Sequence, residues 1–293
     1  MNKNITAIVP ALNEEKNIEK VLLDLNKFCK NIIVINDGST DNTSEILEKI
    51  SLSIPKKLLI ITNKKNQGIG YSMKVGLAKA LEFSNSIVIK IDGDGQHEPR
   101  DIIKFIDKII LENYDFVKGN RFLIKEDLEN MPITKLVGNL IVTNLQKIIS
   151  GHYNISDPNN GFLAMKKSIL ERIDLESLQN NYFFENSLLL NVTSHHFSVG
   201  EVGIKTIYND EKSSIPLVAA SIKLLPTFLK LLFIKNRIGT RYYLSANSVI
   251  FFIICSLLFI NLFINSLAIW IFIIFLLALY VGIDILNFFS DKN

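Results

Sequence analysis

The chain has 293 residues, which is enough for one large domain or for one domain with an appendage. Its formal net charge is only +3, so the charge gives no reason to expect a nucleic-acid partner, and we expect none. Hydrophobic residues make up 48% of the chain and concentrate towards the C-terminus. The first apolar run, residues 5–9, is too short for a secretory signal, so we expect no such signal.

Short apolar runs alternate with helical patterns in the N-terminal part of the chain. These runs lack the polar alternation of a half-exposed strand, so we expect strands that are buried on both faces. Alternation of strands and helices predicts βαβ units and a mostly parallel, Rossmann-like sheet of the α/β class. The predicted strands are ITAIV (5–9), NIIVIN (31–36), KLLIIT (57–62), SIVIKI (86–91) and DFVKG (115–119).

Three helices are predicted between these strands from apolar residues at helical spacing. We expect Asn13 to be the N-cap of the first helix. The apolar positions are Ile18, Val21, Leu22, Leu25 and Phe28 in the first, Val75, Ala78 and Leu81 in the second, and Ile102, Ile103, Phe105, Ile106 and Ile109 in the third.

Polar motifs follow three of the predicted strands, namely PALNEE, NDGSTDNT and DGDGQH. Ligands of parallel sheets bind beyond the carboxyl ends of the strands, so these motifs mark the predicted site. A dinucleotide-binding domain would carry G-x-G-x-x-G after the first strand, where this chain has PALNEE. A P-loop is also absent from the sequence. Nicotinamide and ATP chemistry are therefore disfavoured.

Asp37 follows the second strand, and two interpretations apply to its motif. Asp37 is well placed to accept hydrogen bonds from a ligand, whereas the whole stretch 37–41 could simply turn the chain and cap the next helix. We expect Thr40 or Asp41 to cap the helix and Asp37 to bind.

Asp92 and Asp94 lie one residue apart in a glycine-rich turn at the end of an apolar strand. The pair could belong to an ordinary tight turn. Hard cations such as Mg²⁺ bind through one or two carboxylates together with substrate phosphates. We therefore expect Asp92 and Asp94 to hold a divalent cation, Mg²⁺ or Mn²⁺, and through it a diphosphate.

Several other polar residues have two possible roles. Glu185 lies among apolar residues on a predicted helix, where it could form a structural ion pair or contact substrate. His97 could approach a phosphate or only complete the turn. His195 and His196 are sequence neighbours whose side chains point in different directions, so we do not expect a metal site there.

The C-terminal tract from Val249 to Phe289 is almost uninterrupted Ile, Leu, Phe, Val and Ala. A helix needs about 20 apolar residues to cross a bilayer, so the tract predicts two transmembrane helices, near 247–263 and 266–288. Positive residues flank both ends of the tract and predict that these ends lie on the cytoplasmic side. A buried helical hairpin is the less favoured alternative. Since Cys255 lies in this tract and Cys29 in a predicted soluble helix, we expect no disulfide.

The segment 215–241 combines basic and apolar residues. Lys223, Lys230 and Arg237 are seven residues apart, which places them near one stripe of a helix whose other positions are largely apolar. This pattern is typical of a helix that lies in the membrane interface, where the basic residues would meet phosphates at the membrane face. A solvated amphipathic helix packed on the domain is the alternative.

Together these motifs resemble a known family. They are IVPALNEEKNI, VINDGSTDNT, NQGIGYSMKVGLAKA, KIDGDGQHEPRDI, KGNRF, DPNNGFLAM and TIYNDEKSSI, in this order. Followed by a predicted membrane hairpin, they are similar to family 2 glycosyltransferases of GT-A fold, in the branch of dolichyl- or polyprenyl-phosphate sugar synthases. Two positions depart from the family pattern, since Asn160 stands where Ser is frequent and Gly203 where Pro is frequent.

The resemblance implies roles for several residues. Pro10, Leu12, Glu14 and Asp37 would surround the base and ribose of a nucleotide-sugar donor, and Asp92 would also contact that donor. Asp92, Asp94 and Gln96 would be the metal and diphosphate residues. Arg121 would face donor or acceptor phosphates, and Asp157 would be the acidic residue sometimes regarded as a catalytic base. Because a phosphate monoester is already mostly deprotonated at neutral pH, we expect Asp157 to orient groups rather than to abstract a proton.

The expected architecture is a GT-A catalytic domain over 1–212, interfacial helices over 213–242 and a two-span anchor over 243–293. The expected activity is inverting transfer of a single sugar from a nucleotide-diphosphate sugar to a polyprenyl phosphate at the cytoplasmic face of the membrane. A homo-oligomer is possible. One alternative is a transferase that acts on another lipid or glycan. The other is a membrane scaffold that binds a nucleotide sugar without catalysis.

Overall fold

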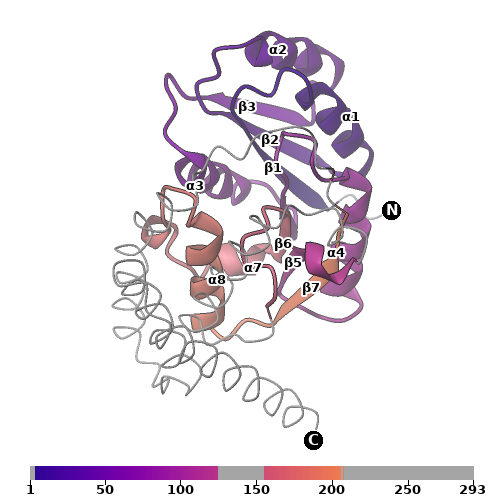
Figure 1. The fold of residues 1–293 in the computed structure, drawn as a ribbon, viewed down its shortest axis with the longest axis vertical. Coiled ribbons are helices and arrows are strands. Elements are labelled where there is room, and N and C mark those ends of the chain that lie inside the picture. Colours follow the sequence, from indigo (N-terminus) through magenta and orange to yellow (C-terminus); the bar gives the residue numbers. More distant parts are fainter. Residues whose placement is uncertain (1–3, 125–154, 206, 208–293) are drawn as a thin grey trace, which may run out of the picture. The chain divides into compact units, whose positions relative to one another are not determined.

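The computed structural model of the chain describes residues 4–124, 155–205 and 207. Within these residues, strands form a 7-stranded sheet in the order β3-β2-β1-β4-β6-β5-β7 (Figure 1). The strands are β1 (Ile5–Ala11), β2 (Asn31–Asn36), β3 (Leu58–Thr62), β4 (Ile87–Lys90), β5 (Phe116–Asn120), β6 (Leu163–Lys166) and β7 (Val199–Gly203).

The sheet is mostly parallel. Strand β1 pairs in parallel with β2 and β4, β2 pairs in parallel with β3, and β5 pairs in parallel with β7. Strand β6 is antiparallel to both of its neighbours, β4 and β5. The predicted α/β class with a mostly parallel sheet is therefore confirmed.

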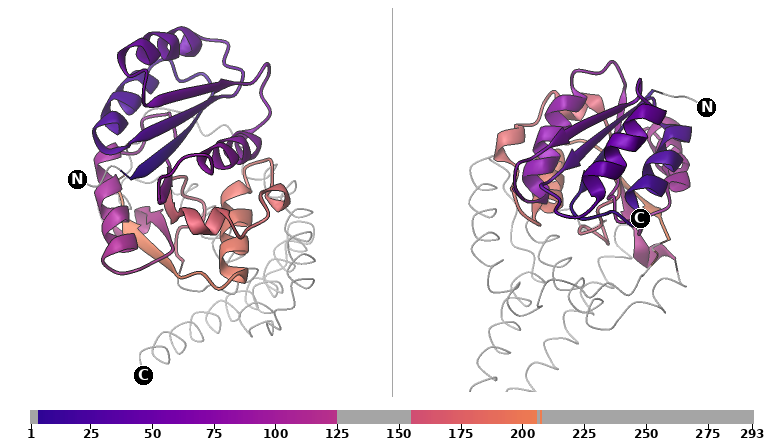
Figure 2. Two further views of the ribbon diagram at one scale, coloured as in Figure 1. Left: turned by 180° about the vertical axis from the view of Figure 1, so that it is seen from behind. Right: turned by 90° about the horizontal axis from the view of Figure 1, so that it is seen from above.

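Helices cover both faces of the sheet (Figure 2). Side chains of α1, α2 and α4 pack on one face, and side chains of α3, α7 and α8 pack on the other. The helices are α1 (Ile18–Phe28), α2 (Thr43–Ser53), α3 (Ile69–Ala80), α4 (Ile102–Ile110), α7 (Lys167–Leu170) and α8 (Phe184–Ser194). Short 3₁₀ turns are η1 (Pro99–Asp101), η2 (Arg121–Leu123) and η3 (Leu175–Ser177).

The expected start of the first helix is wrong. Helix α1 begins at Ile18 with Asn17 at the N-cap position, and Asn13 lies earlier in a left-handed conformation with φ 58°. Asn and Asp tolerate this conformation better than other residues with a side chain. The Asn13 side chain accepts a hydrogen bond from the Thr40 amide at 2.8 Å, so it joins two loops rather than capping a helix.

The helix predicted after the third strand is present as α3, but its predicted apolar positions face the core only in part: Val75 and Leu81 are half-buried and pack against it, whereas Ala78 is exposed. Met73, Leu77 and Ala80 form the fully buried side of the helix. Gly76 lies on the same buried side. A Cβ atom at this position would lie 2.5 Å from Cγ2 of Ile8, so α3 presents its glycine side to the sheet and approaches it closely.

The predicted C-terminal elements lie outside the described residues. These are the spans near 247–263 and 266–288, the interfacial segment 213–242, and its basic residues Lys223, Lys230 and Arg237. Among the residues that the structure describes, no helix is both long and apolar enough to cross a bilayer. The predicted boundaries after residues 212 and 242 therefore stay predictions.

Candidate active site

The polar motifs meet at one edge of the sheet. Strands β1 to β5 are parallel to one another, so their carboxyl ends lie at the same edge. Because β6 runs in the opposite direction, its first residue also lies there, and this brings the loop 156–162 to the same place. The site is therefore assembled from five strand ends and one strand start.

The loops after β1 and β2 are tied together by hydrogen bonds. The amide of Asn13 donates to Oγ of Ser39 at 3.0 Å, and the amide of Glu14 donates to Oγ1 of Thr43 at 2.8 Å. Pro10 is buried within β1, whereas Leu12 is exposed and Glu14 half-buried. Pro10, near the end of β1, thus lies beside the end of β2, and Leu12 and Glu14 follow in a loop that hydrogen bonds tie to the loop after β2.

Asp37 orders the neighbouring loop. Its carboxylate accepts hydrogen bonds from Nδ2 of Asn63 at 2.7 Å and from the amides of Gln67 at 2.9 Å and Gly68 at 2.8 Å. Asp41 accepts the amide of Thr43, the first residue of α2, at 3.0 Å. Asp37 therefore fixes the loop between β3 and α3, and its contact with a ligand stays a prediction.

Asp92 is paired with a buried lysine. Nζ of Lys90 lies 2.7 Å from Oδ1 of Asp92 and 3.0 Å from Oε1 of Glu185. Burial alone would raise the pKa of Asp92, but the adjacent ammonium holds it below its ordinary value, so the carboxylate is ionised. Of the two roles considered for Glu185, the structure shows the ion pair.

Gly161 packs directly against Asp92. A Cβ atom at this glycine would lie 2.1 Å from Oδ2 of Asp92 and 2.8 Å from Nζ of Lys90. No other residue fits here without displacing the carboxylate or the ammonium. The loop before β6 therefore closes over the base of the Asp-x-Asp turn.

The rest of the turn is shaped by Asp94 and by glycines. Oδ1 of Asp94 accepts the amide of Gln96 at 2.9 Å, and Gly95 has a positive φ of 73°. His97 is 8% exposed, and its ring packs 5.5 Å from that of Phe162. Burial lowers the pKa of His97 to about 4, so its imidazole is neutral at physiological pH and packs within the turn.

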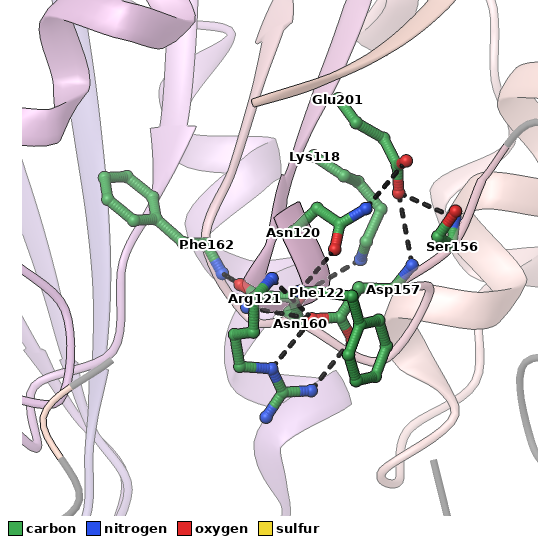
Figure 3. Close-up of polar contacts among 9 residues, drawn as sticks. All are labelled: Lys118, Asn120, Arg121, Phe122, Ser156, Asp157, Asn160, Phe162 and Glu201. Carbon is green, nitrogen blue, oxygen red and sulfur yellow. Dashed lines mark hydrogen bonds and ion pairs between the residues drawn. The ribbon is translucent and has the colours of Figure 1, made fainter. Parts of the chain in front are cut away.

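Arg121 and Asp157 form a bidentate ion pair (Figure 3). Nε and Nη2 of Arg121 donate to the two oxygens of Asp157 at 2.7 and 2.8 Å, and the Arg121 amide donates to Oδ2 at 3.2 Å. The Asp157 side chain is 0% exposed and that of Arg121 is 16% exposed. Although burial alone would raise the pKa of Asp157, the hydrogen bonds and charge of Arg121 hold it below its ordinary value.

Two further side chains hold the loop that carries Asp157 (Figure 3). Oε1 of Glu201 accepts the amides of Ser156 at 2.8 Å and Asp157 at 3.1 Å. Nζ of Lys118 donates to the carbonyl of Asn160 at 2.8 Å, and burial lowers the pKa of this lysine to about 8. Oδ1 of Asn160 accepts the Phe162 amide at 2.8 Å, so this departure from the family pattern is built into the loop.

Lys90, Lys118 and Glu201 were missed as site residues by sequence reasoning. A signal was present for both lysines, because each interrupts a predicted apolar strand, SIVIKI or DFVKG. Buried lysines require partners, so a lysine within such a strand indicates a buried acidic group nearby. Glu201 gave no comparable signal, since the strand β7 was not predicted.

The residues at this edge suit a hard divalent cation that shares its ligands with a substrate. Among the residues that the structure describes, no three His, Cys, Asp or Glu side chains lie close enough to hold a metal alone. Asp92 and Asp94 supply two carboxylates, and Mg²⁺ binds in proteins through one or two carboxylates plus substrate phosphates. The donor chemistry therefore fits a cation that binds together with a diphosphate.

His195, at the end of α8, is exposed and contacts the Asn191 carbonyl.

Known proteins resemble this chain in sequence. Residues 6–174 match the model of Glycosyl transferase family 2. A UDP-N-acetylglucosamine–dolichyl-phosphate N-acetylglucosaminyltransferase from Methanococcus voltae is 34% identical over 221 residues, covering 71% of this chain and 88% of the relative. A polyprenol monophosphomannose synthase from Mycolicibacterium smegmatis is 26% identical over 200 residues, covering 67% of this chain and 75% of that relative.

The fold also resembles a solved structure. Glucosyl-3-phosphoglycerate synthase from Mycobacterium tuberculosis, in complex with Mn²⁺ and UDP-glucose, superposes with a TM-score of 0.52 at 20% identity, covering 79% of this chain and 80% of that one. The described sheet and its helices are thus GT-A-like. The family match and the shared length of the relatives confirm the resemblance that the motifs indicated: the chain belongs to glycosyl transferase family 2 and is a glycosyltransferase.

Proposed function

We propose that the protein transfers a single sugar, with inversion, from a nucleotide-diphosphate sugar to a polyprenyl phosphate. The observation that carries this proposal is the similarity to a transferase named for a dolichyl-phosphate acceptor. The two sequences are 34% identical, and the match covers 88% of that transferase. The site supports this proposal, because the carboxylates of the Asp-x-Asp turn and the ion pair between Arg121 and Asp157 lie at one edge of the sheet. A non-catalytic scaffold would have no need for this arrangement.

The transfer breaks the bond between the anomeric carbon and the donor diphosphate and forms a bond from that carbon to an acceptor phosphate oxygen. A nucleoside diphosphate leaves with the bonding electrons, and its growing charge must be stabilised. A divalent cation held by Asp94, beside Asp92 and Gln96, would supply Lewis-acid stabilisation of that charge. Arg121 adds a planar guanidinium that is suited to phosphate oxygens.

Asp157 orients Arg121 in this proposal and does not remove a proton. Its two carboxylate oxygens already accept the hydrogen bonds of the Arg121 side chain. The nucleophile needs little help, because the second pKa of a phosphate monoester is near 6 and its oxygen is mostly deprotonated at neutral pH. A hydroxyl acceptor would instead require a general base within hydrogen-bonding distance.

The acceptor is a membrane lipid, so the proposal includes attachment to the membrane. The C-terminal tract would cross the bilayer twice, with the catalytic domain on the cytoplasmic side, and the basic residues Lys223, Lys230 and Arg237 would lie at the headgroup level. Replacing all three with Gln is expected to raise the KM for the lipid acceptor more than the KM for the donor. An unchanged acceptor KM would contradict the proposed role of these residues.

The proposed reaction is tested with the full-length protein purified in detergent. Labelled UDP-N-acetylglucosamine, UDP-glucose and GDP-mannose are offered separately with dolichyl or undecaprenyl phosphate, and label in the organic phase is measured with and without EDTA. Label from one donor that EDTA abolishes is the expected result. In parallel assays with diacylglycerol or a glycan as the acceptor, transfer to these acceptors alone would favour the alternative transferase. Donor binding without turnover on any acceptor would favour the scaffold.

A further inference from the structure

Lys90 is a buried charged residue that takes no direct part in the proposed reaction. It is 1% exposed and lies at the end of β4. The register of the sheet places both Lys90 and Lys118 opposite Leu163 of β6. Residues that face each other across neighbouring strands project to the same face of the sheet. Two buried lysines therefore flank one leucine on the face that α8 covers.

Lys90 uses its full hydrogen-bonding capacity. An ammonium group has three protons to donate. Nζ lies 2.7 Å from Oδ1 of Asp92, 3.0 Å from Oε1 of Glu185 and 3.1 Å from the carbonyl of Gly161. These acceptors come from the end of β4, from α8 and from the loop before β6. Lys90 thus joins the Asp-x-Asp turn to two other parts of the fold.

Glu185 is held in place by the helix that carries it. It is 7% exposed in the first turn of α8, between Phe184 and Leu188, which are fully buried. The next residue, Asn186, donates from Nδ2 to Oδ1 of Asn159 at 3.1 Å, which ties the same turn to the loop before β6. The carboxylate of Glu185 therefore approaches Lys90 from a fixed direction.

We propose that Glu185 is a positioning residue for the Asp-x-Asp turn, because it shares Lys90 with Asp92 and so preserves the charge of Asp92 for a divalent cation. This inference rests on the proposed function, in which the cation binds with the donor. The Lys90 ammonium is thereby shared between two carboxylates, so Asp92 is not its only acidic partner. Without the charge of Glu185, Lys90 would neutralise Asp92 alone.

The proposal predicts a specific pattern in Glu185→Gln, which keeps the size of the side chain and removes its charge. Mn²⁺ binding in the presence of nucleotide should weaken by about tenfold or more, a usual effect of changing a residue behind a metal ligand. Binding of the nucleotide without metal should be unchanged or slightly tighter, because a negative charge has been removed near an anion. A loss of folding would weaken both kinds of binding.

The Lys90→Met variant tests whether the effect of Glu185 on Mn²⁺ affinity depends on Lys90. If Glu185 acts through Lys90, Glu185→Gln should have little further effect on Mn²⁺ affinity in the Lys90→Met background. Asp115→Asn is a matched control, because Asp115 forms a half-buried ion pair at 2.9 Å with Lys166 at the opposite end of β6. This variant loses an ion pair of the sheet far from the turn and should leave Mn²⁺ affinity unchanged.

The experiment titrates Mn²⁺ by electron paramagnetic resonance into the full-length protein in detergent with UDP and, in parallel, with GDP. Metal-free binding of each nucleotide is measured by calorimetry. Weaker Mn²⁺ binding in Glu185→Gln, with metal-free binding retained, supports the proposal. If that variant does not fold, Glu185→Asp takes its place and should show intermediate Mn²⁺ affinity.

Three results would overturn the proposal, and they differ in meaning. Wild-type Mn²⁺ affinity in Glu185→Gln would overturn the positioning role alone, as would equal and additive losses in the Lys90→Met background. A wild-type protein that binds neither Mn²⁺–UDP nor Mn²⁺–GDP would overturn the proposed function together with the positioning role.

Discussion

Asp157→Asn should destabilise the catalytic domain by removing one partner of a buried ion pair. Asp157 is 0% exposed and Arg121 is 16% exposed, so the arginine that remains is largely shielded from water. Removing one partner of a buried pair costs about 3–5 kcal/mol, and the partial exposure of Arg121 places the expected loss near the lower end, at about 3 kcal/mol. With a urea dependence of about 2–3 kcal/mol/M, the unfolding midpoint should fall by about 1 M.

Cys29 offers a local probe of this unfolding. Its thiol is buried, and burial raises its pKa to about 12, so it reacts with thiol reagents only after the domain opens. Pulsed labelling across a urea series, in a Cys255→Ser background, therefore reports the unfolding of the core beneath α1. Asp24→Asn is the control, because the Lys27–Asp24 pair is 66% and 30% exposed and should contribute less than about 1 kcal/mol.

The double variant Arg121→Gln/Asp157→Asn tests the reasoning most sharply. Removing both charges leaves no guanidinium deprived of the Asp157 carboxylate, so the double variant should be more stable than Asp157→Asn alone. A double variant whose loss equals or exceeds the sum of the two single losses would refute the account of the pair. A loss of less than about 1 kcal/mol in Asp157→Asn would do the same, since exposed pairs contribute that little.

Three further predictions concern the site. Asp94→Asn should nearly abolish transfer whereas Asp157→Asn leaves a measurable remnant, and equal, complete loss in both would favour a true catalytic base. Gly161→Ala should weaken nucleotide–Mn²⁺ binding by about tenfold or more, since its Cβ would lie 2.1 Å from Oδ2 of Asp92; calorimetry showing unchanged affinity would contradict the packing. The pKa of Lys118 is about 10.4 in the unfolded chain and about 8 in the folded protein. Between about pH 8 and pH 10.4 the unfolded state therefore binds more protons than the folded state. The free energy of unfolding of the wild type, relative to that of Lys118→Met, should therefore rise from pH 8 to pH 10. Urea unfolding measures this difference, and a difference that stays constant with pH would contradict the prediction.

Much of the fold could be predicted from periodicity because its central strands are buried on both faces. Strands β1 to β5 were expected within one or two residues of their bounds, since apolar runs such as NIIVIN have few alternative structures. Strands β6 and β7 were missed for physical reasons. Strand β6, LAMK, has four residues and none of them is β-branched, and β7, VGEVG, has two valines separated by glycine and glutamate and so no apolar run.

The site was predictable in its motifs but not in its internal contacts. Asp92, Asp94 and Asp37 could be proposed because carboxylates at strand ends are poor packing residues. Which acidic side chain pairs with which basic side chain depends on strand order. A local sequence pattern does not predict that the antiparallel strand β6 lies between β4 and β5. Only this insertion brings the loop of Asp157 and Gly161 between the two lysine-bearing strands.

The most direct test of the proposed activity is transfer of label from a nucleotide sugar to a polyprenyl phosphate. UDP-N-acetylglucosamine with dolichyl phosphate is the first pair to measure, because a relative that is 34% identical is named for it. UDP-glucose and GDP-mannose follow, each with and without EDTA. The proposed activity predicts organic-phase label from one donor, abolished by EDTA and by Asp94→Asn. Transfer that persists in EDTA and in Asp94→Asn, or the absence of lipid-linked label with every donor and both polyprenyl phosphates, would contradict it.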